Sequence, residues 1–284
     1  MAQDLMNPEL EGELRQFIAG DRPENSAVVF AGTGVNSALH NFVSVRLGLD
    51  RLLAMKEVHL ISGGVYAYLG FYAHRHGLMQ AEKGRMVEWE RQNRRDWGVI
   101  PVYSFLHFLL NRARGKGHVF SGDRPTRPLK RALVPELYTK SVAELPANVR
   151  IWCYSQLEKK LVCISSRDPY WAGLSIADVA TAAMAIPGLT EPLEYKGQLY
   201  SDADFCPETG RLRGLLKEVS ANTLYSNMMK HGPEGNVRFV RPHNQRDGRK
   251  MMSRDFLKFI FGLPNPALAA ALEEMFAEGR QMPE

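Results

Sequence analysis

A serine followed by two glycines separates two apolar segments. Residues 58–61 read Val-His-Leu-Ile, Ser62-Gly63-Gly64 follow, and residues 65–73 are almost all apolar. Serine at a helix start is usually a cap for free backbone N–H groups. A strand–serine–helix turn is also the geometry of a nucleophile elbow, which exposes a reactive hydroxyl. Because a helix that is apolar all round must be buried and central, we favour an exposed, reactive Ser62 over a simple cap.

A second glycine-rich turn follows the first apolar run of the chain. Residues 27–30 read Ala-Val-Val-Phe, and Gly32, Thr33 and Gly34 lie just beyond them. Glycines between a buried strand and a helix leave backbone N–H groups free to bind an anion. In an acyl-transfer enzyme such groups form the oxyanion hole, and Gly63, at the next helix start, is expected to support it.

The same turn could belong to a dinucleotide-binding fingerprint. That motif needs a third glycine, at the position of Ser37, and an acidic residue about 20 positions further on. Glu57 stands at the start of the next strand rather than at its end. The sequence therefore favours oxyanion binding over nucleotide binding.

A reactive serine needs a base, and the sequence offers two kinds. His231 and His243 follow Ser62 in the chain order of a Ser–Asp–His triad, but both lie in polar loops with glycine or proline. The other candidate is Asp202, in the Ser-Asp-Ala-Asp turn at 201–204. Taken alone, this turn is more simply an Asx-turn in which Asp202 caps backbone N–H groups.

The predicted elements are those of a parallel α/β sheet, because buried parallel strands read as continuous apolar runs between helices. Residues 78–147 read as a helical insertion or lid, so we expect one domain over residues 1–284. Strands are expected at 27–30, 57–61, 149–154, 161–164, 197–205 and 237–240, and helices at 8–18, 36–47, 63–76, 175–185 and 265–280.

The composition indicates an ordinary globular protein with a basic excess. The 284 residues are 45% hydrophobic and 24% charged, with a formal net charge of +5. The chain begins without an apolar leader and has no uncharged run of membrane-span length, so we expect a cytoplasmic protein, peripheral at membranes at most. The three cysteines have neither disulfide nor zinc-ligand spacing, and we expect no metal and no cofactor.

Basic residues concentrate in two stretches. Residues 112–131 hold seven Lys or Arg against one acid, and a second cluster lies at 238–254. Such stretches are often solvated loops, but they can also bind anionic lipid headgroups or an acyl carrier protein. No nucleic-acid-binding motif accompanies them, so we expect no nucleic-acid partner. The candidate membrane- or carrier-binding residues are Arg124, Arg127, Lys130 and Arg131.

Taken in order, these motifs resemble the patatin-like phospholipase family. The glycine-rich turn, the Ser-x-Gly elbow, a helix that ends in Ala-Ile-Pro-Gly at 185–188, and Tyr-Ser-Asp-Ala-Asp at 200–204 follow one another as in that family. The resemblance covers residues 27–204, and 237–242 match a late strand. It implies an α/β three-layer sandwich with a mostly parallel central sheet.

The resemblance also implies a catalytic Ser–Asp dyad without histidine. Ser62 is then the nucleophile and Asp202 its sole partner, and the turn from Gly32 to Gly34 supplies the oxyanion N–H groups. Three places depart from the family pattern. Leu60 replaces the first elbow glycine, Ala203 replaces the glycine after the catalytic Asp, and Thr33 with Val35-Asn36 interrupts the usual glycine-rich oxyanion segment.

The expected function is that of a serine acyl hydrolase, lipase- or phospholipase-like, which cleaves an acyl ester through an acyl-enzyme. One alternative is an acyltransferase or thioesterase that acts on a carrier-bound acyl chain. A second alternative, from another class, is a non-catalytic binding protein on a lapsed hydrolase fold, and Leu60 is the feature that supports it.

Overall fold

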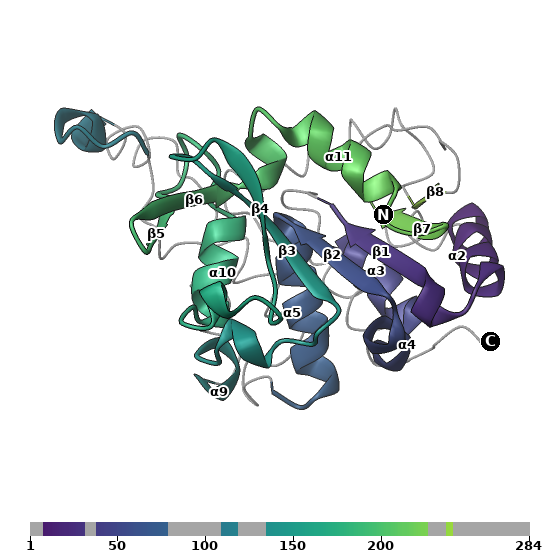
Figure 1. The fold of residues 1–284 in the computed structure, drawn as a ribbon. Coiled ribbons are helices and arrows are strands. Elements are labelled where there is room, and N and C mark those ends of the chain that lie inside the picture. Colours follow the sequence, from purple (N-terminus) through teal and green to yellow (C-terminus); the bar gives the residue numbers. More distant parts are fainter. Residues whose placement is uncertain (1–7, 32–37, 79–108, 119–134, 227–236, 241–284) are drawn as a thin grey trace.

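The centre of the structure is an eight-stranded sheet (Figure 1). The computed structural model describes residues 8–31, 38–78, 109–118, 135–226 and 237–240. Strand pairing follows the path β5-β6-β3-β2-β1-β7-β8, in which neighbours are hydrogen-bonded, and β4 also pairs with β3. Their bounds are β1 Ser26–Phe30, β2 Glu57–Ile61, β3 Val149–Ser155, β4 Lys160–Ile164, β5 Leu193–Tyr195, β6 Gln198–Asp202, β7 Asn222–Ser226 and β8 Val237–Val240.

The sheet is mixed. β8, β7, β1, β2 and β3 form its parallel half. β4 and β6 pair antiparallel with β3, and β5 pairs antiparallel with β6. β1 is buried along its whole length, as its continuous apolar run predicts. The predicted α/β class is therefore confirmed, with strands of both directions in the sheet.

Helices lie on both faces of the sheet (Figure 1). Val28 and Phe30 of β1 belong to the larger core, with the helices α3, α5 and α10, whereas Val29 belongs to a second core that contains Leu212 of α11. This division follows from the strand period of two, which sends successive side chains to opposite faces. The helices are α2 Pro8–Gly20, α3 Ala38–Leu47, α4 Leu49–Ala54, α5 Gly63–Arg75, α10 Ile176–Ala183 and α11 Thr209–Lys217.

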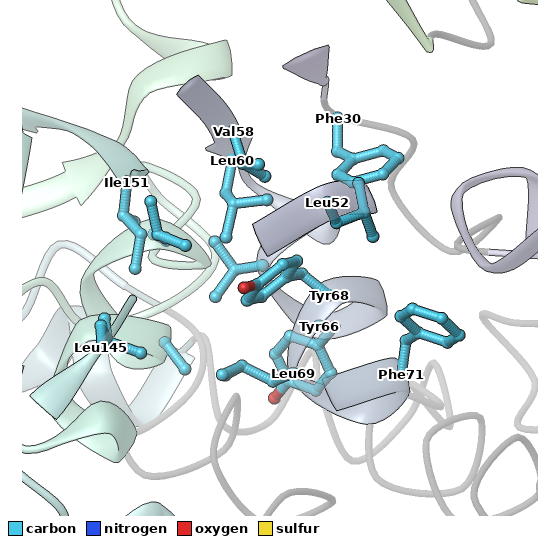
Figure 2. Packing of buried hydrophobic residues seen from close by; sticks show 14 of the residues in the cluster. Phe30, Leu52, Val58, Leu60, Tyr66, Tyr68, Leu69, Phe71, Leu145 and Ile151 are labelled. Carbon is cyan, nitrogen blue, oxygen red and sulfur yellow. The ribbon is translucent and has the colours of Figure 1, made fainter. Parts of the chain in front are cut away.

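The helix that follows Ser62 is deeply buried. Tyr66, Tyr68, Leu69 and Phe71 of α5 are all at most 2% exposed. In Figure 2 the side chain of Leu60 extends from β2 toward this helix. The prediction of a central, buried helix after Ser62 is confirmed.

Two predicted helical regions fall mainly outside the described residues. Within 78–147, the structure has a helical turn α9 at Pro135–Tyr138 and a 3-10 turn η3 at Val142–Glu144. The C-terminal helix expected at 265–280 is outside the described residues, so both the lid and that helix stay predictions. In the part of the chain that the structure describes, no helix is long and apolar enough to cross a membrane.

Candidate active site

Ser62 has a backbone conformation that residues with a side chain seldom adopt. Its φ is 50° and its ψ is −125°. A non-glycine residue in such a region costs about 1–3 kcal/mol and persists only where the surrounding structure imposes it. The Ser62 side chain makes no capping hydrogen bond, although the residue stands at the N-cap position of α5. A simple helix cap therefore does not explain this serine.

The strained turn allows α5 to approach the sheet very closely. A Cβ atom added at Gly64 would lie 2.2 Å from the backbone oxygen of Phe30 on β1. Only glycine fits such a contact without displacement of backbone. Leu60, where an elbow usually has glycine, is fully buried in the larger core instead. The close approach thus depends on Gly64, and Leu60 does not obstruct it.

One edge of β3 is shared by two strands that approach each other end to end. β2 runs parallel to β3 and its last residue, Ile61, pairs with Trp152, whereas β6 runs antiparallel and its last residue, Asp202, pairs with Cys153. Both strands must lie on the same edge, because β4 pairs with the same stretch of β3 and occupies the other edge. The ends of β2 and β6 therefore meet, and Ser62 comes beside Asp202.

The Asp202 carboxyl is completely buried and firmly held. Its backbone N–H donates to the carbonyl of Ala185, just after α10, at 3.0 Å. Its Oδ1 accepts the N–H of Asp204 at 2.8 Å, so the Asx-type cap expected for this turn does form. Oδ2 makes no hydrogen bond with the described residues. One carboxyl oxygen thus holds the turn, and the other is available to a neighbour.

Burial raises the pKa of Asp202 from its usual 3.8 to about 7. The Ser62 hydroxyl and the N–H of Asp204 act in the opposite direction, while the charge on Asp204 adds to the rise. Ser62 Oγ lies close enough to lower the Asp202 pKa, yet the contact falls short of standard hydrogen-bond geometry. Loose contacts of this kind are common in catalytic pairs before substrate binds. Asp202 therefore changes its protonation state near neutral pH, beside the Ser62 hydroxyl.

Ser62 is only 1% exposed, and the expectation of an exposed hydroxyl is wrong. Exposure was expected from the position at a helix start, but Gly63 and Gly64 of the same turn are buried as well. Burying a hydroxyl without a hydrogen-bond partner costs about 1–3 kcal/mol. Ser62 Oγ and Asp202 Oδ2 both lack a standard partner among the described residues. Their arrangement therefore lowers stability and calls for a functional explanation.

His40 is a site residue that the sequence motifs did not single out. Its Nε2 lies 2.6 Å from the carbonyl oxygen of Ala31, which can only accept, so Nε2 carries the proton. Nδ1 then accepts the hydroxyl of Ser226 at 2.8 Å. Burial lowers the pKa of His40 to about 4 and keeps it neutral. The ring ties the ends of β1 and β7 together, at the carboxyl ends of the parallel strands, where Ser62 also lies.

Several predicted site residues lie outside the described residues. These are the oxyanion-turn residues Gly32, Thr33 and Gly34, the histidines His231 and His243, and the basic residues Arg124, Arg127, Lys130 and Arg131. Gly63 is described and is the buried first residue of α5. Within the described ranges, no histidine shifts the Asp202 pKa. Among the described residues, no cluster of His, Cys, Asp or Glu could hold a metal ion.

In comparisons with known proteins, no family model matches the chain, and no curated protein matches it either.

Proposed function

We propose that this protein is a serine acyl hydrolase, with Ser62 as nucleophile and Asp202 as its general base. The proposal rests on one observation: Ser62, in a strained backbone conformation, lies beside the buried, titratable carboxyl of Asp202 where β2 and β6 end against β3. Strained serines and perturbed carboxyls cluster at catalytic sites. The order of the sequence motifs further supports membership of the patatin-like family, with a three-layer, mostly parallel core.

The proposed reaction has two halves. Ionised Asp202 takes the proton from Ser62, whose oxygen attacks the acyl carbonyl, and the alcohol leaves with that proton. Asp202 then takes a proton from water, whose oxygen attacks the acyl carbon. The bond from that carbon to Ser62 Oγ breaks, Asp202 returns the proton to Ser62, and the acid leaves. The oxyanion of each tetrahedral intermediate would rest on N–H groups of Gly63 and of the turn from Gly32 to Gly34, as the sequence predicts.

The base has a clear pH signature. Only ionised Asp202 can accept the Ser62 proton, and its pKa is about 7. The value of kcat/KM should therefore rise as pH increases through about 7 and level off above it. Substrate binding could move this midpoint in kcat but not in kcat/KM, which reports the free enzyme.

The burial of Ser62 favours a second candidate, an acyltransferase, over a thioesterase, which must hydrolyse its acyl-enzyme. Because a site that excludes water protects an acyl-enzyme from hydrolysis, an alcohol, amine or thiol acceptor could compete for the acyl group. We propose the same Ser–Asp chemistry for this case, with a carrier-bound thioester as acyl donor. The partner would then be an acyl carrier protein rather than an anionic membrane surface, and the protein would be cytoplasmic in both cases.

The test is covalent labelling by a small fluorophosphonate, followed by intact-mass analysis and hydrolysis of p-nitrophenyl butyrate. Ser62→Ala should lose both signals, and Asp202→Asn should lower kcat by about a thousandfold or more. The matched control is Ser201→Ala, because Ser201 is also buried, adjacent to Asp202 and without a hydrogen-bond partner among the described residues. It should keep both signals.

Two outcomes would overturn the proposal. Wild-type labelling of folded Ser62→Ala would remove the nucleophile assignment. A wild-type protein that neither reacts with the probe nor turns over acyl esters or thioesters would instead favour a binding protein on a lapsed hydrolase fold.

A further inference from the structure

The turn that follows Asp202 is held by the start of α11. This 3-10 turn, η5, spans Ala203–Phe205. Thr209, the first residue of α11, places its hydroxyl among the carbonyl oxygens of Ala203, Asp204 and Cys206, at 3.1, 3.1 and 2.6 Å. The N–H of Asp204 in the same turn donates to Asp202 Oδ1, so α11 contacts the turn that holds the carboxyl.

One helical turn further on, Arg213 reaches the same segment. Its Nη2 lies 3.1 Å from Oδ1 of Asp204, and the two side chains are 24% and 11% exposed. Thr209 and Arg213 are four residues apart and so share one face of α11. Thr209 contacts the backbone of η5 and Arg213 contacts its carboxylate. Since the ion pair is largely buried, solvent screens it less than an exposed pair.

Four groups from three parts of the fold act on or near Asp202. They are Ser62 after β2, Cys153 on β3, and Asp204 and Cys206 in and after η5. Burial raises the pKa of both thiols, and the charge on Asp202 adds to that rise, so the thiols stay neutral. Asp204 is therefore the neighbour whose full negative charge opposes ionisation of Asp202.

The charge on Asp204 is in turn balanced by its surroundings on α11 and β7. Arg213 is the cation in direct contact with it. Tyr225 on β7 faces both residues, and burial raises the pKa of its phenol, which keeps it uncharged. In the part of the chain that the structure describes, the cation in contact with Asp204 thus comes from the helix that also holds this turn through Thr209.

We propose that Arg213 and Asp204 are positioning residues that aim the Asp202 carboxyl and set the pH at which it gains its proton. The catalytic meaning of this inference rests on the proposed function, but the proton equilibrium of Asp202 does not. Arg213 acts through Asp204: it offsets a charge that would otherwise hold Asp202 in its protonated form.

Three substitutions give opposite and linked expectations. Arg213→Met leaves Asp204 unbalanced, so the Asp202 titration should move to higher pH by roughly one unit. Asp204→Asn removes the opposing charge, so the titration should move to lower pH by a similar amount. The double variant should titrate between the two single variants, because the fields of the two charges at Asp202 add. Arg213→Lys keeps a cation and should stay close to wild type.

The first readout is carbon NMR of protein labelled at aspartate Cγ, with the Asp202 signal assigned from Asp202→Asn. It reports the proton equilibrium without any turnover. The second readout is the pH profile of kcat/KM for p-nitrophenyl butyrate, whose midpoint should follow the NMR midpoint in every variant.

The inference is overturned if Arg213→Met and Asp204→Asn move the Asp202 titration in the same direction or leave it unchanged. It is also overturned if the double variant titrates outside the range set by the two single variants. If Arg213→Met does not fold, Asp204→Asn and Arg213→Lys still decide between the outcomes. A shifted NMR titration in a protein without esterase activity would instead preserve this inference and contradict the proposed function.

Discussion

Replacing Asp202 by Asn should stabilise the folded protein, although it should abolish the proposed activity. The carboxyl has a pKa of 3.8 in a solvated chain and about 7 in the fold. Between these values the unfolded chain releases its proton while the folded one retains it. The stability contributed by this group is therefore present below pH 3.8 and is lost as pH rises through about 7.

The magnitude follows from the size of that shift. Each unit of pKa difference is worth about 1.4 kcal/mol, so the full cost of ionising Asp202 in the fold is about 4 kcal/mol above neutral pH. The amide of the Asp202→Asn variant does not titrate, and its oxygen can still accept the Asp204 N–H. The stability of Asp202→Asn relative to wild type should thus grow by about 1.4 kcal/mol per pH unit up to pH 7 and then level off.

Urea denaturation of both proteins from pH 4.5 to 8.5 measures this difference. Comparison at each pH cancels the contributions of all other titratable groups, His40 included. Asp50→Asn, at an exposed position in the first turn of α4, controls for the loss of one negative charge. A difference between Asp202→Asn and wild type that stays flat with pH would refute a buried carboxyl with a raised pKa.

Three further predictions concern the parts that surround the site. Gly64→Ala should destabilise by about 1–3 kcal/mol in urea denaturation, because its Cβ meets backbone, whereas Gly214→Ala, with open space, should stabilise by about 0.5–1 kcal/mol. The His40 pKa is about 4 in the fold and 6.5 in the unfolded chain, so protonation of His40 favours the unfolded chain. The free energy of unfolding of Asp202→Asn should therefore fall by about 2 kcal/mol through His40 between pH 7 and pH 5. In Asp202→Asn/His40→Gln the fall should be smaller by that amount. The last prediction concerns a variant in which four basic residues are replaced by Glu: Arg124, Arg127, Lys130 and Arg131. At low salt it should co-sediment less with anionic vesicles, or be captured less by an acyl carrier protein, and should still hydrolyse p-nitrophenyl butyrate. Unchanged binding would show that this stretch is a solvated loop.

The elements that the sequence predicted well are those with a strong local pattern. The apolar runs of β1 and β2 and the uncharged run of α5 each identify a buried element without knowledge of its neighbours. The turn residues Ser62 and Gly64 also stand out locally, because serine and glycine there serve no ordinary strand or helix.

β7 shows where local pattern fails. Its sequence, Asn-Thr-Leu-Tyr-Ser, looks polar, yet every residue is buried beside β1. The polar groups are satisfied by distant partners: Asn222 donates to the Phe17 carbonyl at 3.1 Å and to Ser26 at 2.9 Å, and Ser226 pairs with His40. A buried polar strand is stable only when such bonds exist, and sequence periodicity does not contain them.

The sequence by itself determined which residue types could perform acyl chemistry and which strand–turn–helix unit carries Ser62. The tertiary structure alone decided that β2 and β6 meet on one edge of β3, that Asp202 is buried enough to titrate near neutral pH, and that α11 holds the turn beside it. The physical reason is range. Hydrophobic periodicity and turn preference act over a few residues, whereas desolvation, charge balance and strand register arise between segments far apart in the chain.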